Sequence, residues 1–325
     1  MFFCIQHQTR FAYEFPITES LMELRMQPRS EGTQRCHSFL VKVNPRARVL
    51  SYRDHLGNHV HHFNVAARHD EMLIVTEAMV ETSEPEEIPE RLETNTWHEL
   101  DHIVASEDHW EFLLASDFAR PTPLLEKLAA EIGVDRSLDP LSAVHQLNNA
   151  LFEKFEYVPK HTSVNSPIDH ALEDRKGVCQ DYAHILTALI RGLGIPCRYV
   201  SGYVYRGDDP TGATRESTSH AWVEALLPRL GWVGLDPTNA MFASERHIRT
   251  AIGRDYADVP PTKGVFRGNA QSDLNVLVRV TRGEEPMVSD LRQELWFNAQ
   301  PPTFGQRSLA ADAALFQRQQ QQQQQ

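Results

Sequence analysis

The stretch from residue 177 to 193 constrains the fold more than any other part of the chain. Its large apolar residues recur at the spacing of one helix face: Tyr182, Ile185, Leu186, Leu189, Ile190 and Leu193. Gly194 and Pro196 end the pattern, because glycine accepts a left-handed cap and proline cannot continue a helix. The sequence therefore predicts a helix with a buried face, from about Cys179 to Leu193.

Cys179 stands at the start of this predicted helix, three residues before Tyr182, and continues its buried face. Unpaired backbone N–H groups and the positive end of the helix dipole gather at such a position, and both favour a thiolate over a thiol. A cysteine nucleophile would fit here. The helix alone leaves another interpretation open, in which Cys179 is a small apolar residue at a buried helix start.

Two short alternating runs around a Pro/Gly turn, residues 219–227 and 232–239, predict a β-hairpin. With three residues in the turn, Asp236 lies across from Trp222 and diagonal to His220, roughly 7–8 Å away at the Cα atoms. A carboxylate at that distance can orient an imidazole. Taken singly, His220 could be a hydrogen-bonded strand residue, and Asp236 a turn residue before proline.

A thiol at a helix start, with a histidine and an acid on neighbouring strands, is the arrangement that cysteine nucleophiles use. In such a site His220 would accept the proton of Cys179 and later protonate the leaving group. Asp236 would hold the imidazole in one tautomer and stabilise the imidazolium. We therefore predict these three residues as catalytic.

Four segments together resemble the transglutaminase-like superfamily, and more narrowly the bacterial transglutaminase-like proteins described as cysteine proteases. They are RKGVCQDYAH at 175–184, GIPCRYVSGY at 194–203, SHAW at 219–222 and DPTN at 236–239. The resemblance implies an α+β, papain-like core in which the nucleophile helix packs on an antiparallel sheet, preceded by a small β domain. It implies Cys179 as nucleophile, His220 as base and Asp236 as orienting acid.

The chain departs from the superfamily's protein cross-linking enzymes in one respect. Those enzymes place an oxyanion-stabilising tryptophan some way upstream of the cysteine, whereas the last tryptophan before Cys179 is Trp110. The backbone N–H of Cys179 can be one oxyanion donor, and Gln180 and Tyr157 are candidates for a second donor or for lining the cleft. We interpret Cys197 as a packing residue.

The function that these residues favour is cysteine-dependent hydrolysis of an amide or peptide bond through an acyl-enzyme, with water as the second nucleophile. One alternative is protein-glutamine acyl transfer to an amine, which depends on how well the acyl site excludes water. Another is a peptide- or protein-binding module that cleaves nothing. We expect a peptide, protein or small amide as substrate, and no cofactor.

Two groups of histidines suggest metal binding at first sight. Residues 98–102 spell HExxH, which on a helix would place His98 and His102 on one face for zinc, with Glu99 as base. The surroundings are poor in apolar residues, and Glu126 is only a guess for a third ligand. Alternation splits His61 from His62 in the second group, which spans residues 55–69 and has no cysteine or carboxylate set. We expect no metal at either place.

Composition divides the chain into four parts. Residues 1–82 read as strands separated by turns and predict an antiparallel β domain, and 83–122 are an acidic linker and connecting segment. Residues 123–290 would form the transglutaminase-like core. Residues 291–325 would be a tail that ends in glutamine repeats.

Charge and cysteine content exclude several classes of protein. With 32 basic and 44 acidic residues the formal net charge is -12, which argues against a nucleic-acid or anionic membrane surface. The four cysteines show neither a metal-binding pattern nor a disulfide framework, and no run reaches membrane-spanning length. We expect a cytoplasmic protein that binds neither nucleic acid nor membrane.

Overall fold

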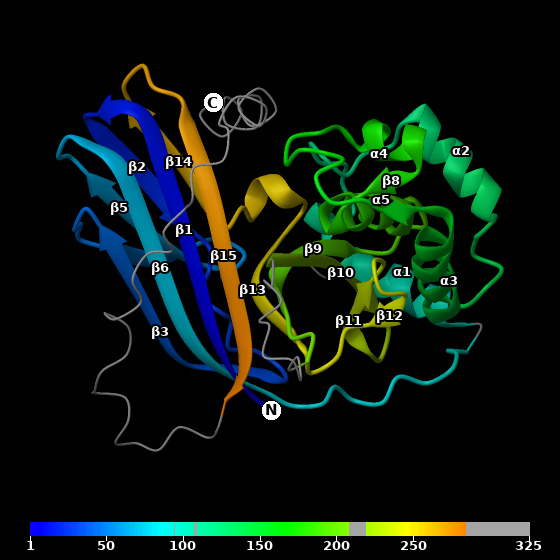
Figure 1. Cartoon of the computed structure of the whole chain (residues 1–325). Helices are drawn as coiled ribbons and strands as arrows, with labels where there is room; N and C mark the ends of the chain where they lie inside the picture. The colour runs from blue at the N-terminus through cyan, green and yellow to red at the C-terminus, as the bar shows by residue number, and fades with distance from the viewer. Residues whose placement is uncertain (94, 107–108, 208–218, 284–325) are drawn as a thin grey trace.

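The computed structural model describes residues 1–93, 95–106, 109–207 and 219–283 and places two halves side by side (Figure 1). One half is built from two four-stranded antiparallel sheets. The other half contains a five-stranded antiparallel sheet and most of the helices. The fold is α+β, as the sequence predicts.

Two sheets with alternating sequences form the half that contains the N-terminus. The first has the order β15 (Ser272–Gly283), β1 (Phe2–Ile17), β6 (His69–Thr82) and β3 (Gln34–Asn44). The second has the order β14 (Thr262–Arg267), β2 (Glu19–Leu24), β5 (His59–Val65) and β4 (Leu50–Arg53). Every second residue along much of β6 is buried, because successive side chains point to opposite faces of a sheet. The buried faces of the two sheets share one core, which includes Phe11, Ile17, Leu24, Phe63, Met72 and Ile74.

Two strands of these sheets come from the far end of the described chain. β15 pairs with β1 from Phe2 opposite Gly283 to Tyr13 opposite Ser272, and β14 pairs with β2. The helical half of the protein is therefore inserted between strands of the two sheets. The range 123–290 predicted for the core contains these two strands, and the predicted tail at 291–325 lies outside the described residues.

The inserted half is a layer of helices against the five-stranded sheet. The order of its strands is β12 (Met241–Phe242), β11 (Gly231–Asp236), β10 (Ser219–Leu227), β9 (Cys197–Val204) and β13 (His247–Gly253). The α-helices are α1 (Thr96–Ser106), α2 (Pro123–Ile132), α3 (Pro140–Lys154), α4 (Ile168–Asp174) and α5 (Cys179–Gly192). The shorter elements are the 3-10 turns Trp110–Phe112 and Tyr256–Asp258 and the parallel pair β7 (Glu156–Tyr157) and β8 (Lys176–Gly177). α5 packs on β9 and β10 of the sheet, which is the predicted arrangement of the nucleophile helix.

α5 is buried on every side, beyond the single face that its periodicity predicts. Every residue from Gln180 to Arg191 is buried, because α2, α3 and α4 cover the sides of the helix that the sheet does not. The Asp181 carboxylate accepts a hydrogen bond from the backbone N–H of Val178 at 2.8 Å and caps the helix start. This packing and this cap fix where the first residue of the helix lies.

Gly202 of β9 lies opposite His220 of β10 and allows β13 to approach closely. A Cβ atom at this position would lie 2.2 Å from the backbone oxygen of Ile248 and 2.6 Å from Cη2 of Trp222. We expect Gly202→Ala to lower the free energy of unfolding by about 3 kcal/mol, because a backbone atom cannot move aside cheaply. Urea denaturation measures the loss.

The matched control is Gly192→Ala, because a Cβ there would meet nothing within 4 Å. The Gly192→Ala protein should be at least as stable as the native protein. Equal unfolding midpoints for the two variants would contradict the close approach of the strands.

Candidate active site

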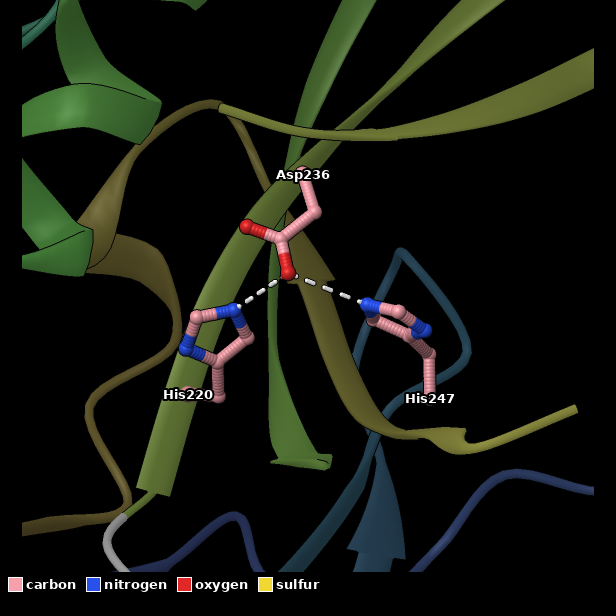
Figure 2. Close-up of side chains that lie close together, drawn as sticks. All are labelled: His220, Asp236 and His247. Carbon is pink, nitrogen blue, oxygen red and sulfur yellow. Dashed lines mark hydrogen bonds and ion pairs between the residues drawn. The ribbon is translucent and has the colours of Figure 1, made fainter. Parts of the chain in front are cut away.

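The β10–β11 hairpin has the register that the sequence predicts. Val223 lies opposite Leu235, and residues 228–230 form a three-residue turn. Asp236 follows in register, and its Oδ2 atom lies 2.8 Å from Nε2 of His220 (Figure 2). The hairpin therefore brings the predicted imidazole and carboxylate into direct contact.

Cys179 lies at the first position of α5 and is partly exposed, close enough to His220 to raise the pKa of that imidazole. Because Asp236 engages Nε2 of that imidazole, Nδ1 is the nitrogen left to face the sulfur atom. The structure thus brings the three predicted residues together from α5, β10 and β11.

The Asp236 carboxylate has no exposed surface and accepts hydrogen bonds at both oxygens. Besides His220, Asn239 donates to Oδ2 at 2.6 Å, and the hydroxyl of Thr238 donates to Oδ1 at 2.6 Å. Burial acts to raise the pKa of Asp236, but the hydrogen bonds from His220 and His247 hold it well below its usual range. Asp236 is therefore a carboxylate anion at neutral pH.

His220 is buried between the thiol and this carboxylate. Burial acts to lower the pKa of His220, whereas the hydrogen bonds with Asp236 and Cys179 and the negative charges of both groups raise it to about 10. An imidazolium at neutral pH favours ionisation of a neighbouring thiol. The arrangement can therefore hold a thiolate–imidazolium pair.

His247 is a fourth member of this cluster, and the sequence analysis missed it. Its Nε2 atom lies 3.1 Å from Oδ2 of Asp236 (Figure 2). Its Nδ1 atom accepts a hydrogen bond from the backbone N–H of Ser244 at 3.1 Å. Its side chain is 3% exposed. No local motif marks this histidine, because its contact with the carboxylate depends on how β13 joins the sheet on the far side of β9.

His220, Asp236 and His247 also have the residue types of a metal site, and their ligand atoms lie within 4.8 Å of one another. A metal would require an unprotonated Nε2 atom on each histidine. The Nδ1 atom of His247 accepts a hydrogen bond from Ser244, so the ring proton of a neutral His247 is on Nε2. The contacts therefore fit a carboxylate that accepts two N–H donors better than they fit a metal-binding triad.

The two candidates for a second oxyanion donor have different surroundings. The Gln180 side-chain amide donates to the backbone oxygen of Val164 at 2.7 Å and is thus engaged in another contact. Tyr157 lies opposite Gly177 in the β7–β8 pair, two residues before Cys179. Burial and the negative charge of Cys179 raise the pKa of Tyr157, so its hydroxyl keeps its proton at neutral pH.

The HExxH segment lies on α1, as the motif requires, but its side chains make other contacts. The carboxylate of Glu99 accepts a hydrogen bond from Arg229 at 2.9 Å, and Asp101 pairs with Arg136. His98 and His102 are both exposed. The carboxylate that a metalloprotease would use as its base is therefore engaged in an ion pair.

The fold and this cluster define an α+β protein with a papain-like core and a cysteine at the start of its central helix. Residues 126–237 match the sequence family described as the transglutaminase-like superfamily. Residues 3–81 match the family described as the bacterial transglutaminase-like N-terminal region. An uncharacterized protein of Mycobacterium leprae is 36% identical over 281 residues, which are 86% of this chain and 98% of that protein. The chain belongs to the transglutaminase-like superfamily, and it carries the N-terminal region of its bacterial members.

Two further comparisons concern the fold and the core. A candidate cysteine protease from Cytophaga hutchinsonii, known from its crystal structure, matches with a TM-score of 0.68 at 20% identity, over 92% of this chain and 94% of that one. A protein-glutamine gamma-glutamyltransferase of Pseudomonas aeruginosa is 32% identical over 126 residues, which are 36% of this chain and 19% of that protein. Superfamily members are typically cysteine-dependent enzymes. Among the described residues, no helix is long and apolar enough to cross a membrane.

Proposed function

We propose that this protein is a cysteine-dependent hydrolase of amide or peptide bonds that acts through an acyl-enzyme at Cys179. The observation that carries the proposal is a buried imidazole, that of His220, which the Asp236 carboxylate holds at 2.8 Å beside the Cys179 thiol at the helix start. A reactive thiol needs such an imidazole, whereas a binding module does not.

In the proposed reaction, the Cys179 thiolate attacks the substrate carbonyl carbon and the carbonyl electron pair moves to oxygen. The His220 imidazolium gives its proton to the amine as the C–N bond breaks, which leaves a thioester. Water then attacks the thioester and gives a proton to His220, and the carboxylic acid leaves as the thiolate re-forms. Asp236 stays ionised throughout and holds the ring.

The oxyanion needs hydrogen-bond donors near the sulfur atom. The backbone N–H of Cys179 is one, because the first N–H groups of a helix have no acceptor within the helix. We propose the hydroxyl of Tyr157 as the second, because its pKa is raised and it stays a donor at neutral pH. Gln180 is the other candidate, because its bond to Val164 uses only one of the two N–H groups of its amide.

Acyl transfer to an amine is the second candidate function, and it is favoured by the sequence likeness of the core to the named glutamyltransferase. The test is to form the thioester from an acyl donor in the presence of a primary amine, which then competes with water for the acyl group. Mostly free acid as product supports hydrolysis, and mostly amide supports transfer. Release of neither product, with Cys179 unreactive, would leave the non-catalytic binding module.

We further propose a peptide, a protein or a small amide as the substrate and a reducing compartment such as the cytoplasm as the location. All four cysteines are unpaired in the structure, which is what a reducing compartment produces. The net charge of -12 supports a protein that binds neither nucleic acid nor an anionic membrane.

The rate at which iodoacetamide labels Cys179 as a function of pH tests the proposed function without a substrate. At pH 6 we expect labelling at least about ten times faster than for an ordinary thiol, because a paired thiolate persists far below the free pKa of about 8.5. His220→Ala should remove this excess. Peptide mapping locates the label.

Cys197 is the internal control in the same experiment. Its side chain is fully buried, and burial raises the pKa of Cys197 to about 12, so it should stay unlabelled throughout. If Cys179 shows an ordinary thiol profile that His220→Ala leaves unchanged, the nucleophile proposal is wrong.

A further inference from the structure

One oxygen of Asp236 accepts hydrogen bonds from two imidazoles. The Oδ2 atom lies 2.8 Å from Nε2 of His220 and 3.1 Å from Nε2 of His247, and the two rings approach it from β10 and β13 (Figure 2). The proposed reaction uses only the first of these imidazoles. The imidazole of His247 is also buried, but the proposed reaction assigns it no role.

The two ring nitrogens of His247 have different partners, and these partners indicate its tautomer. The backbone N–H of Ser244 donates to Nδ1, so that nitrogen must offer a lone pair. The ring nitrogen that carries a proton toward Asp236 is therefore Nε2, and His247 is a hydrogen-bond donor to the carboxylate.

Other hydrogen bonds besides that of His247 hold the Asp236 carboxylate in position. Thr238 donates to Oδ1 through its hydroxyl at 2.6 Å and its backbone N–H at 3.1 Å, and Asn239 donates to Oδ2 at 2.6 Å. The main effect of the His247 N–H is therefore electrostatic. It draws negative charge away from the oxygen that stabilises the His220 imidazolium.

We propose that His247 is a positioning residue that makes the His220 imidazolium a stronger acid by sharing the Asp236 oxygen with it. This inference rests on the proposed role of His220 as the acid and base of the reaction. An imidazolium bound too strongly by its carboxylate would be a poor proton donor to the leaving amine. The His247 N–H weakens that hold and brings the acidity of His220 closer to neutral pH.

Among the described residues, the titratable groups around this pair of imidazoles come from several elements. His220 faces Cys179 from α5 and Asp236 from β11, and the centroids of its ring and the His247 ring lie 6.3 Å apart. On its other side His247 lines a cavity that it shares with the charged residues Glu86, Glu87, Glu224, Glu245 and Arg249. Glu224 is compensated there by two ion pairs, with Arg198 and with Arg249.

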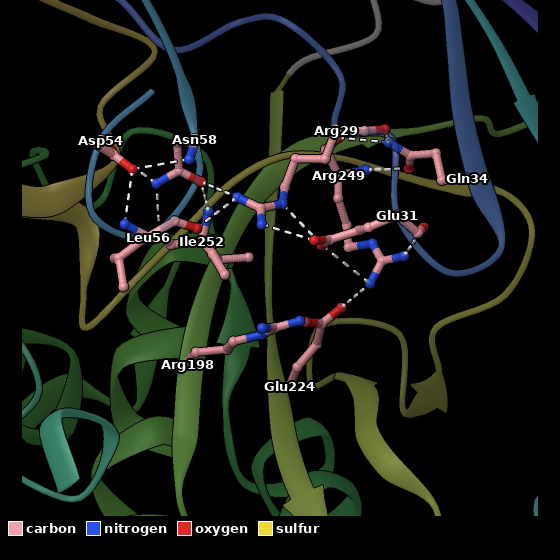
Figure 3. Close-up of polar contacts among 10 residues, drawn as sticks. All are labelled: Arg29, Glu31, Gln34, Asp54, Leu56, Asn58, Arg198, Glu224, Arg249 and Ile252. Carbon is pink, nitrogen blue, oxygen red and sulfur yellow. Dashed lines mark hydrogen bonds and ion pairs between the residues drawn. The ribbon is translucent and has the colours of Figure 1, made fainter. Parts of the chain in front are cut away.

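The N-terminal half holds the strand that carries His247. The Gln34 side-chain amide bonds to both the N–H and the C=O of Arg249, at 2.8 and 2.9 Å, and the Asn58 amide does the same with Ile252 (Figure 3). Each amide makes the two backbone hydrogen bonds that a neighbouring strand would make at the outer edge of β13. The position of His247 against Asp236 is therefore fixed from outside the transglutaminase-like core.

Two substitutions separate the contacts of His247. In His247→Gln the side-chain nitrogen can still donate to Asp236, whereas in His247→Asn the side-chain oxygen can still accept from Ser244 but the donor to Asp236 is lost. The readout is the alkylation rate of Cys179 by iodoacetamide between pH 5 and pH 11. A thiolate reacts faster once its imidazolium partner loses its proton, so a second rise in rate marks the titration of His220.

We expect the second rise to move upward by about 0.5–1 pH unit in His247→Asn, the size of one hydrogen bond, and to stay in place in His247→Gln. The control is His69→Asn, because His69 is a buried histidine of the N-terminal half that bonds to Ser20 and does not contact Asp236. It should leave the profile unchanged. A merely structural role would lower the stability of both His247 variants without moving the midpoint.

An unmoved midpoint in His247→Asn, a downward shift, or equal shifts in both His247 variants would overturn the inference. If instead the native protein shows no step that disappears in His220→Ala, the proposed function itself fails and the inference fails with it. Nitrogen NMR of the 15N-histidine-labelled native protein tests the inference even if a variant does not fold. It should show Nε2 of His247 protonated and Nδ1 unprotonated, and the opposite tautomer would refute it.

Discussion

Replacing Cys179 by serine is expected to reduce acyl transfer from 4-nitrophenyl acetate by about 10³-fold or more, because a serine hydroxyl stays protonated beside His220 where a thiol ionises. The native protein should release nitrophenolate in a burst and carry an acetyl group on the peptide that contains residue 179. Mass spectrometry of the digested protein should find no acetyl group there in Cys179→Ser.

The matched control for this experiment is Cys36→Ser. Cys36 is a partly buried cysteine of β3, and its thiol donates to the backbone oxygen of Ser38. A serine can make the same bond, and the burst should be unchanged. A burst that survives in Cys179→Ser but disappears in Cys36→Ser would place the nucleophile elsewhere.

The largest expected effect on stability is that of Asp236→Ala. Removing the carboxylate leaves the N–H groups of His220, His247 and Asn239 without their shared acceptor, and it leaves a buried imidazolium without its counter-charge. We expect the free energy of unfolding to fall by about 3–5 kcal/mol at neutral pH, the usual loss when one partner of a buried ion pair is removed. Urea denaturation followed by far-UV circular dichroism measures it.

Asp101→Ala is the matched control, because Asp101 pairs with Arg136 at the surface. Its loss should cost less than about 1 kcal/mol, as is usual for exposed ion pairs. If the two alanine variants lose the same amount, Asp236 is not the buried acceptor that the contacts indicate.

The stability difference between the native protein and Asp236→Ala should also depend on pH. The pKa of Asp236 is lowered by folding, so its contribution is present above its unfolded pKa of about 3.9 and is lost as the pH falls below that value. The pKa of His220 is raised to about 10, so its contribution is complete below its unfolded pKa of about 6.5 and is lost as the pH rises toward 10. The difference should be largest between about pH 4 and pH 6.5.

Local patterns were enough to predict the two elements that build the site. The spacing of apolar residues located α5, and Gly194, with a φ of +79°, ends it within two residues of the predicted position. Alternation and a three-residue turn fixed the hairpin register, because a shift by one residue would turn Asp236 away from His220. Both elements depend on residues close together in the chain, and such short-range patterns can be recognised in the sequence itself.

Long-range contacts could not be predicted in the same way. The pairing of β15 with β1 and the contact of His247 with Asp236 depend on how strands distant in sequence meet. Neither Gln34 nor Asn58 has a neighbour in sequence that indicates a bond to β13. Burial of α5 on all sides likewise follows from helices that arrive from elsewhere in the chain, and its own periodicity shows only one apolar face.

The pairing of Phe2 with Gly283 has a consequence for the order in which a growing chain can fold. During synthesis β1 and β2 leave the ribosome before the inserted half, whereas their outer neighbours β14 and β15 follow it. Until then both strands present unpaired N–H and C=O groups, which in a sheet edge invite pairing with other chains. The inserted half can form its helices and its own sheet before β14 and β15 are made, so β1 and β2 gain their outer neighbours only after that half has been synthesised.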